Sequence, residues 1–223
     1  MAERFRVETG PGEAVTALLY TADSRNSVRL VLGHGAGAGQ TSSFMVMVAR
    51  ELASRGIDTI TFNFAYTEHG RRLPDPNQTL EACYRAVIAT VVREQIGEGR
   101  LAIGGKSMGG RIATQVAAAG APDVAALVLL GYPLHPPGKP HQLRSRQLPA
   151  ITAPMLFVQG SRDAFGTPDE LRPIIGKLKA RCDLHVVEGG DHSFKVLKRE
   201  GFSQDETYRQ ILDRIAQWLR ELP

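Results

Sequence analysis

Residues 101–110, LAIGGKSMGG, constrain the fold more than any other stretch of this chain. They contain Gly-Lys-Ser, the end of a phosphate-binding loop, and also Gly-x-Ser-x-Gly, the pattern of a nucleophile elbow. A phosphate-binding loop of the form G-x-x-x-x-G-K-[ST] requires glycine at position 100, where this chain has Arg100. Residues 100–103 also have the pattern of a strand, which leaves too little backbone before Lys106 to wrap a phosphate. The stretch therefore predicts an elbow.

An elbow needs a strand that ends just before the serine and a helix that begins at once after it. RLAIGG at 100–105 predicts the strand, Ser107 occupies the turn, and GGRIATQVAAAG at 109–120 predicts the helix. The serine of such a turn has a strained backbone, and side chains at positions 105 and 109 would collide with the neighbouring strand and helix. We therefore expect Gly105 and Gly109 to be required there, with Ser107 as the nucleophile.

The rest of the chain predicts an α/β fold with a mostly parallel eight-stranded sheet and helices on both faces, because short apolar runs alternate with segments of helical period. The predicted strands are 4–8, 14–20, 28–34, 57–64, 100–105, 124–130, 154–160 and 184–189. The first two, joined across Gly10-Pro11-Gly12, predict a hairpin at one edge. We expect one domain over 1–223, and no cap domain, because the irregular stretch 132–154 is too short to form one.

Three further helices are predicted from their ends. One begins near Ser42 and stops at Gly56, which is typical of a glycine after a helix C-terminus. A second is expected over about 79–96. The last follows Ser203, which has the capping-box spacing to Glu206.

The partners of Ser107 are predicted from their order along the chain. A serine hydroxyl becomes an effective nucleophile when a base takes its proton and an acid holds that base in the correct tautomer. After an elbow the expected order is Ser, then Asp or Glu, then His. His192 follows the last predicted strand in GGDHSF, and Asp163 follows the strand at 154–160 in GSRDAFG, so both emerge at the edge where open α/β sheets bind ligands. We take His192 as the base and Asp163 as the acid.

Other residues compete for these roles. Asp191 and Glu188 lie close to His192 in sequence, but a neighbouring side chain rarely has the geometry to orient an imidazole. Asp163 has an alternative role as the cap of the helix that follows it. His185 lies inside the last predicted strand, where a structural or surface role is expected.

An oxyanion hole requires two backbone amides. Met108, after the nucleophile, supplies the first, and the loop HGAGAG at 34–39 supplies the second through Ala36 or Gly37. The glycines of that loop do not have the G-x-G-x-x-G spacing of a dinucleotide-binding loop, and no acidic residue ends the next strand. We therefore expect no nucleotide cofactor.

With Ser107, Asp163 and His192 in that order, the chain resembles the α/β-hydrolase superfamily over residues 14–220. The stretches HGAGAG, FNFAY with GRRLPDP, GGKSMGGR, GYPLHPPGKP, QGSRDAFG and GDHSF resemble a narrower group of small, lidless predicted hydrolases allied to the dienelactone hydrolases. The resemblance implies that these three residues are nucleophile, acid and base. Dienelactone hydrolases proper carry a cysteine nucleophile, whereas this chain has serine. Eukaryotic relatives occur as subunits of chromatin complexes, so a protein partner is not excluded.

The expected reaction is hydrolysis of carboxylic esters with small or flexible acyl groups, through an acyl-enzyme and without a cofactor or metal. The short 132–154 stretch predicts an open site. Candidate residues at its mouth are Lys106, Arg72, Arg111, Tyr132, His135 and Arg144. The basic ones either favour carboxylated or phosphorylated esters, or are solvated or ion-paired. His135 and His141 match no metal-ligand spacing.

Composition and termini restrict the other functional classes. The net charge is +4 with scattered basic residues, and no nucleic-acid-binding module accompanies it. MAERFRVETG lacks an apolar run, and Cys83 and Cys182 lack a C-x-x-C spacing, so we expect neither a signal peptide nor a membrane span, and a reduced, cytoplasmic location. Two alternatives stay open: a binding or scaffold protein on the same fold, and a thioesterase or peptidase with the same three residues.

Overall fold

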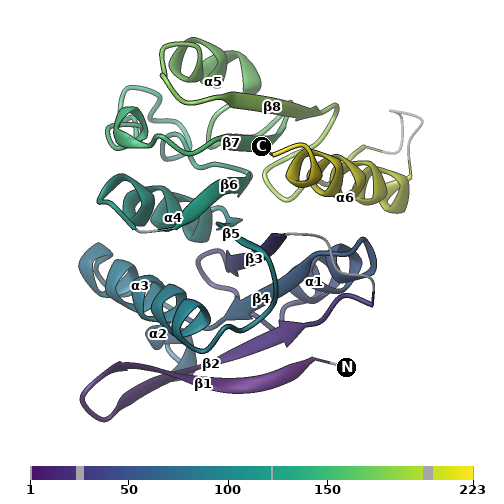
Figure 1. Cartoon of the computed structure of the whole chain (residues 1–223). Helices are drawn as coiled ribbons and strands as arrows, with labels where there is room; N and C mark the ends of the chain where they lie inside the picture. Colours follow the sequence, from purple (N-terminus) through teal and green to yellow (C-terminus); the bar gives the residue numbers. More distant parts are fainter. Residues whose placement is uncertain (1, 24–27, 122, 198–202, 223) are drawn as a thin grey trace.

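A computed structural model describes residues 2–23, 28–121, 123–197 and 203–222, and within them eight strands form one sheet. The strands are β1 (Glu3–Gly10), β2 (Glu13–Tyr20), β3 (Val28–Gly33), β4 (Asp58–Phe62), β5 (Arg100–Lys106), β6 (Val124–Leu130), β7 (Met155–Gly160) and β8 (Cys182–Val187). Their order is β1-β2-β4-β3-β5-β6-β7-β8, with β1 and β2 antiparallel at one edge and β4 through β8 parallel (Figure 1). The predicted mostly parallel eight-stranded sheet is confirmed.

Helices cover both faces of this sheet, as predicted. They are α1 (Ser43–Ser54), α2 (Ala65–Glu68), α3 (Asn77–Arg93), α4 (Met108–Ala118), η1 (Leu148–Ala150), α5 (Pro168–Ile175) and α6 (Gln204–Arg220). Figure 1 shows α1 and α6 on one face and α3 and α4 on the other. The first pair buries Met45 and Trp218 in one core, and the opposite core contains Tyr84, Ile112 and Phe157.

The burial of the strands follows from this layering. Every residue of β4 and β7 is buried, because helices cover both faces of these strands. Most residues of the edge strand β1 are exposed or half-buried. The connection from β6 to β7 contains only the short η1 as a helix in the described chain, so no cap domain covers this edge of the sheet.

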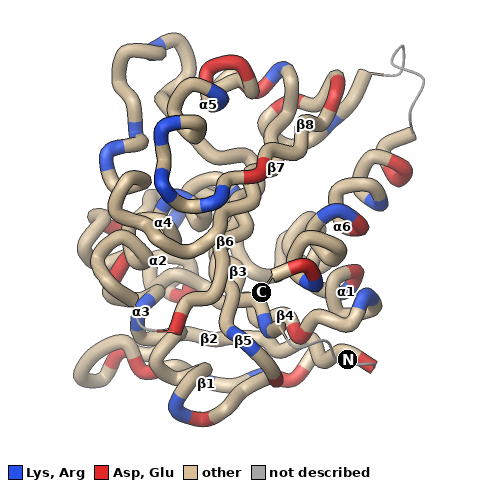
Figure 2. The backbone as a smooth tube through the Cα atoms, turned by 45° about the horizontal axis from the view of Figure 1, so that its top comes forward, with Lys and Arg blue, Asp and Glu red and all other residues tan. Residues whose placement is uncertain are grey.

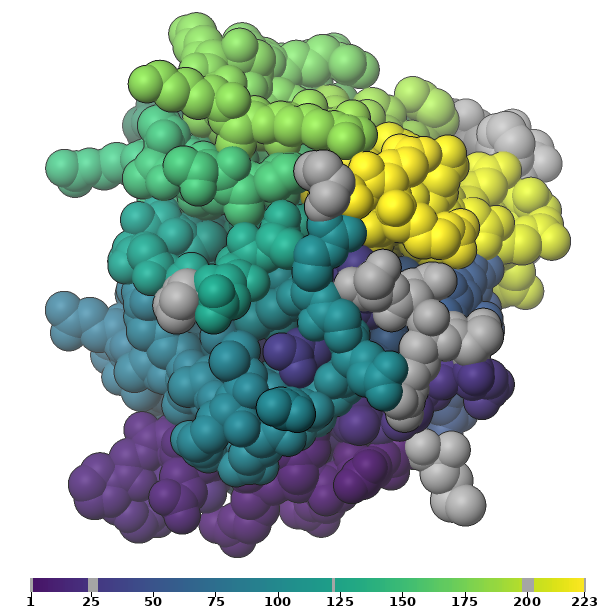
Figure 3. Space-filling model, in the orientation of Figure 1, coloured from purple at the N-terminus to yellow at the C-terminus, as the bar shows by residue number. Residues whose placement is uncertain are grey.

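Figures 2 and 3 show how the charged residues and the two ends of the chain are distributed. Lys and Arg are interspersed with Asp and Glu along the backbone in Figure 2, so the basic residues form no single block. In the space-filling view of Figure 3, the N-terminal hairpin (purple) forms one edge of the molecule and α6 (yellow) lies beside the green segments of β7 and β8. No helix within the described ranges is long and apolar enough to cross a membrane.

Two helix ends differ from the sequence prediction. The helix expected over 79–96 is α3, which begins after Pro76 and ends before Gln95, whose φ of 52° interrupts the helix. Ser203 caps α6 by accepting a hydrogen bond from the Glu206 amide. A reciprocal capping box forms instead at the start of α5, between Thr167 and Glu170.

The strand order brings the loops after β3 and β5 to the same edge of the sheet. The chain proceeds from β3 outward to β4 on one side, and later to β5 on the other side. In open α/β sheets, the crevice at such a switch point lies beyond the carboxyl ends of the strands and binds ligands. The loops after β3 and β5, which begin at His34 and Ser107, open into this crevice.

Candidate active site

Ser107 occupies a sharp turn between β5 and α4. Its backbone has φ 50° and ψ −112°, a strained combination for a residue with a side chain. The Ser107 amide donates to the carbonyl of Leu130 at 2.9 Å, which ties the turn to the end of β6. The strand, turn and helix therefore follow one another as the elbow pattern predicts.

The glycines beside Ser107 permit close packing of backbones. A Cβ atom at Gly105 would lie 2.3 Å from the carbonyl oxygen of Gly33, and a Cβ at Gly109 would lie 2.1 Å from the same oxygen. Both distances are shorter than real Cβ contacts allow. The elbow thus rests directly on the last residue of β3. A Cβ at Gly105 would also lie 2.8 Å from Gly109 C and 2.9 Å from Gly110 N, so the collisions involve both the strand and helix α4.

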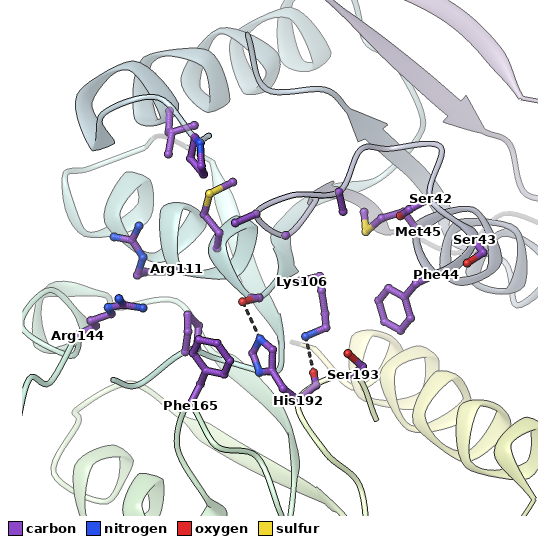
Figure 4. A pocket seen from close by; sticks show the side chains of 18 of the residues that line it. Ser42, Ser43, Phe44, Met45, Lys106, Arg111, Arg144, Phe165, His192 and Ser193 are labelled. Atoms are coloured by element: carbon purple, nitrogen blue, oxygen red, sulfur yellow. Dashed lines mark hydrogen bonds between the residues drawn. The ribbon is translucent and has the colours of Figure 1, made fainter. Parts of the chain in front are cut away.

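A chain of hydrogen bonds links Ser107 to two loops at the same edge. Ser107 Oγ lies 2.8 Å from His192 Nε2 (Figure 4). On the other side of the ring, His192 Nδ1 lies 2.8 Å from Asp163 Oδ2. Asp163 follows β7 with a fully buried side chain, whereas the His192 side chain, in the loop after β8, is 21% exposed. A neutral imidazole that donates from Nδ1 to the carboxylate presents Nε2 as an acceptor to the serine hydroxyl.

Gln159, which the sequence analysis missed, fixes the Asp163 carboxylate. Its side chain is fully buried and donates to Asp163 Oδ2 at 2.8 Å and to the Gly166 carbonyl at 2.7 Å, while its amide oxygen accepts from the Tyr132 amide. Asp163 Oδ1 accepts from the Phe165 amide. A polar residue near the end of an otherwise apolar strand was the sequence signal for this role.

The alternative role of Asp163 as a helix cap does not occur. Thr167 is the N-cap of α5, and its side chain accepts the hydrogen bond from the Glu170 amide. The Asp163 carboxylate is directed instead to His192 and Gln159. It is therefore available to orient the imidazole.

Lys106 holds the backbone of the His192 loop. Its ammonium group donates to the His192 carbonyl at 2.6 Å and lies 5.3 Å from the centre of the Phe194 ring. Burial lowers the pKa of Lys106 to about 8, although the carboxylates of Asp163 and Asp191 oppose that shift. Phe165, also missed from the sequence, stacks on the His192 ring with 4.2 Å between ring centres.

The rival acids contact backbone or solvent. Asp191 Oδ1 accepts from the amides of Ser193 and Lys195, so this carboxylate braces the loop. Glu188 is exposed. His185 lies in β8, as expected, where burial lowers its pKa.

The loop after β3 is anchored by His34, a residue that the sequence analysis named only as part of its loop. Its Nε2 accepts from the Phe64 amide, so Nδ1 carries the proton and donates to the Gly35 carbonyl at 2.8 Å. Burial lowers the pKa of His34 and favours this neutral form. The loop therefore holds a fixed position beside Ser107.

The two residues whose amides are expected to bind an oxyanion are Met108 and Ala36. Ala36 and Met108 line the same pocket as Ser107. Met108 is the first residue of α4, so its N–H has no partner within the helix. Gly37, with φ 72°, lines a neighbouring depression instead, which makes Ala36 the better placed of the two predicted donors.

The pocket around Ser107 has a volume of about 700 Å³, and some of the residues predicted to lie at its mouth line it. Lys106, Arg111 and Arg144 line it. Arg72 is exposed and lines the neighbouring depression with Gly37, so its placement at the mouth is wrong.

Tyr132 and His135 are also wrongly placed in the prediction, because both turn into the protein. The Tyr132 ring is fully buried edge-on against Phe157, and its hydroxyl donates to the Arg144 carbonyl at 2.5 Å. His135 is buried with Nε2 3.3 Å from a Glu170 carboxylate oxygen. Both residues belong to the connection between β6 and β7, and their contacts hold it against β7 and α5.

Comparison with known proteins finds similar folds among solved structures. Among solved structures, the chain is similar to a dienelactone hydrolase from Anabaena variabilis, with 19% identity, coverage of 100% of this chain and 96% of the other, and a TM-score of 0.73. A lidless α/β serine hydrolase from Xanthomonas campestris matches at 18% identity, 94% of each chain and a TM-score of 0.69. A serine hydrolase homologue from Coxiella burnetii matches at 18% identity, with coverage of 98% of this chain and 95% of the other, and a TM-score of 0.72.

These likenesses, all at low identity, show the fold. The family follows from a separate match, in which the family model described as alpha/beta hydrolase domain covers residues 26–220. That range includes the strands from β3 onward, the elbow and the loops that carry Asp163 and His192. The resemblance indicated by the motifs is confirmed, and the chain belongs to the family of alpha/beta hydrolase domains.

Proposed function

We propose that this protein is a serine hydrolase that cleaves carboxylic esters with a Ser107–His192–Asp163 triad. The observation that carries the proposal is the continuous hydrogen-bond chain from the strained elbow serine to a buried carboxylate, with 2.8 Å at each link. A serine adjacent to a base that is itself oriented by an acid is the arrangement that activates a hydroxyl for attack. A binding protein would have no chemical need for it.

The reaction proceeds by acyl transfer. Ser107 Oγ forms a bond to the ester carbonyl carbon while His192 Nε2 takes its proton, and buried Asp163 stabilises the imidazolium. The amides of Met108 and Ala36 donate to the oxyanion. The carbon–oxygen bond to the alcohol then breaks, and His192 returns the proton to the leaving oxygen.

Water completes the cycle. It attacks the acyl-enzyme while His192 takes one of its protons, and the bond from the acyl carbon to Ser107 Oγ breaks as that proton returns to the serine. Each step uses side chains and amides of this chain. The open pocket of about 700 Å³ suits small or flexible acyl groups.

The remaining expectations join this proposal. We propose one α/β-hydrolase domain over residues 1–223, a cytoplasmic location, and a small acyl compound as the binding partner, with neither nucleic acid nor membrane. The free thiols of Cys83 and Cys182 support the reduced compartment.

Labelling with a fluorophosphonate tests the triad directly. The purified protein is treated between about pH 6 and about pH 9, the range in which a histidine base becomes neutral, and the mass shift is mapped. We expect labelling at Ser107, and its loss in Ser107→Ala and His192→Ala, because removing a triad member costs about 10⁴-fold or more in rate. Ser54→Ala and His141→Ala, at exposed positions, are the matched controls.

Failure would be equally clear. A folded parent protein that takes no label across this range would remove the hydrolase proposal and leave a binding protein on a hydrolase fold. Once labelling is established, a panel of esters, thioesters and peptides with the same acyl group distinguishes esterase from thioesterase and peptidase activity.

A further inference from the structure

The two ends of the pocket differ in chemical character. Figure 4 shows Arg111 and Arg144 together on one side of His192, and Phe44 and Met45 on the other side. The reactive serine lies between these ends, within 2.8 Å of the imidazole. A substrate that reacts at Ser107 therefore extends toward one or both of these ends.

The two arginines enter the pocket from different segments. Arg111 lies one helical turn after Ser107 on α4, and its guanidinium donates to neutral side-chain oxygens, Asn77 Oδ1 at 3.1 Å and Gln115 Oε1 at 3.5 Å. Arg144 belongs to the connection between β6 and β7. Its backbone is fixed, because its amide donates to the Leu134 carbonyl at 2.7 Å and its carbonyl accepts from the Tyr132 hydroxyl.

In the described part of the chain, neither guanidinium is paired with a carboxylate. Among the residues that the structure describes, no ion pair involves Arg111 or Arg144. Asp75 also lines the pocket, but its Oδ1 is paired with Arg71 at 2.6 Å. Two positive charges thus face one pocket, and no carboxylate of the described ranges lies at ion-pair distance from either.

The nearby charge of Arg144 also affects the pKa of Arg111. Its pKa is lowered by burial first and by the charge of Arg144 second, while Glu81 opposes the shift without forming an ion pair. Placing two like charges close together and partly out of water costs free energy, and an anion bound between them offsets that cost. A planar guanidinium is also the side chain best suited to bind carboxylate or phosphate oxygens.

We propose that Arg111 and Arg144 form a subsite for an anionic group of the substrate, a carboxylate or a phosphate, while an uncharged part of the substrate contacts Phe44 and Met45. This inference rests on the proposed function, since it defines which esters that site prefers. It separates this pair from the other basic residues of the pocket. Lys106 is occupied by the His192 carbonyl, and Lys195 is exposed at the rim.

Matched esters test the subsite. One series shares a 4-nitrophenyl leaving group and varies the acyl terminus, as pentanoate, glutarate monoester and 4-phosphonobutanoate, so a methyl, a carboxylate and a phosphonate occupy equivalent positions. A second series places the charge in the alcohol, as phenyl, 3-carboxyphenyl and 3-phosphonophenyl acetates. The readout is the ratio of kcat/KM for the anionic ester to that for the neutral ester, after subtraction of the uncatalysed rate.

We expect a preference of about tenfold or more for an anionic ester in at least one series, the size of one charge-assisted hydrogen bond. The ratio should fall toward one in Arg111→Gln/Arg144→Gln and weaken as KCl rises, because salt screens the attraction. Arg144→Lys should keep part of it. The larger of the carboxylate and phosphonate ratios identifies which anion the subsite takes.

Two controls make the test specific. Arg146→Gln removes an exposed charge two residues from Arg144 and outside the pocket lining, and it should keep the preference. Lys195→Gln should keep it too, and loss of the preference in that variant alone would overturn the assignment. An absent preference, or one that survives the double substitution, also overturns it. Continued fluorophosphonate labelling of Ser107 in that case would show that the proposed hydrolase activity stands.

Discussion

The two sides of the proposed catalytic site, that of Ser107 and that of Asp163 and His192, are held in place by different physical means. On the nucleophile side, backbone meets backbone: Gly105 and Gly109 pack against the Gly33 carbonyl, and the turn holds Ser107 in a strained conformation. On the acid–base side, polar side chains hold the loops, with Gln159 bonded to Asp163 and Lys106 bonded to the His192 carbonyl. Steric packing tolerates no added atom but does not depend on protonation, whereas a polar network tolerates changes in volume but depends on charge and hydrogen bonding.

The largest expected effect comes from adding atoms on the nucleophile side. Gly109→Val places a Cβ about 2.1 Å from the Gly33 carbonyl oxygen, so β3 and α4 must separate. We expect a loss of more than about 3 kcal/mol in the free energy of unfolding, or failure to fold, together with loss of labelling at Ser107. Chemical denaturation followed by circular dichroism measures it.

Gly10→Ala is the matched control for this steric prediction. A Cβ there meets only Glu13 Cβ, at 4.0 Å, and the stability should change by less than about 1 kcal/mol. Wild-type stability in Gly109→Val would show that β3 and α4 do not pack as closely as described.

A smaller effect is expected from the hydrogen bonds of the acid–base side. Gln159→Leu removes a donor from the Asp163 carboxylate and leaves the Tyr132 amide unpaired, so we expect about 1 to 3 kcal/mol of destabilisation. Misplacement of the imidazole should lower kcat by about 10- to 100-fold with little change in KM. Steady-state kinetics on a neutral ester measure kcat and KM separately and so test this expectation.

Gln147→Leu separates positioning from general damage in that experiment. It removes another side-chain amide that donates to the Tyr132 hydroxyl, but it leaves the bonds of Asp163 in place. Equal losses of kcat in the two variants would contradict a specific role for Gln159.

The buried ammonium group of Lys106 predicts that the free energy of unfolding depends on pH. Folded Lys106 loses its proton at a pKa of about 8, whereas the unfolded chain retains it up to about 10.5. Between these values the unfolded state binds more protons, so the contribution of Lys106 to stability rises with pH across this window. The difference in unfolding free energy between wild type and Lys106→Met should therefore shift in favour of wild type from pH 8 to pH 10.5, by about 3 kcal/mol at most.

Denaturation curves of both proteins at several pH values measure this difference, because other titrations largely cancel in it. A difference that stays constant with pH would mean that Lys106 is more hydrated than its surroundings indicate. The Gly109→Val effect is steric and should show no such window.

The smallest expected effect concerns the ring that stacks on the base. Phe165→Leu removes the 4.2 Å stacking contact with His192, so we expect kcat/KM to fall about two- to tenfold with little change in stability. Phe5→Leu, in the edge hairpin, is the control and should leave the kinetics unchanged. A Phe165→Leu enzyme with wild-type kinetics would show that hydrogen bonds alone orient the imidazole.

Much of the fold and the elbow could be predicted because they depend on neighbours in sequence. The strand before Ser107, the turn and the helix after it are consecutive, and the periodicity of apolar residues marks each of them. The positions of Asp163 and His192 also followed, since residues just beyond parallel strands emerge at the same edge. Their mutual hydrogen bonds are consistent with the chain order used to select them.

The errors concern side chains in irregular connections. Arg72, Tyr132 and His135 were assigned to the mouth because of their loops, but no local pattern specifies where a loop side chain points. Packing decided it: Tyr132 turned inward against Phe157 and His135 toward Glu170.

By itself, then, the sequence determined the order of strands and helices, the elbow and the chain positions of its partners, because hydrophobic period and glycine placement are local properties of the chain. Only the tertiary structure decided which groups converge. Gln159 reaches Asp163, Lys106 reaches the His192 carbonyl, and Arg111 and Arg144 share one end of the pocket because separate segments cross at the same edge of the sheet. Such contacts depend on distances between segments far apart in the chain, which no local pattern encodes.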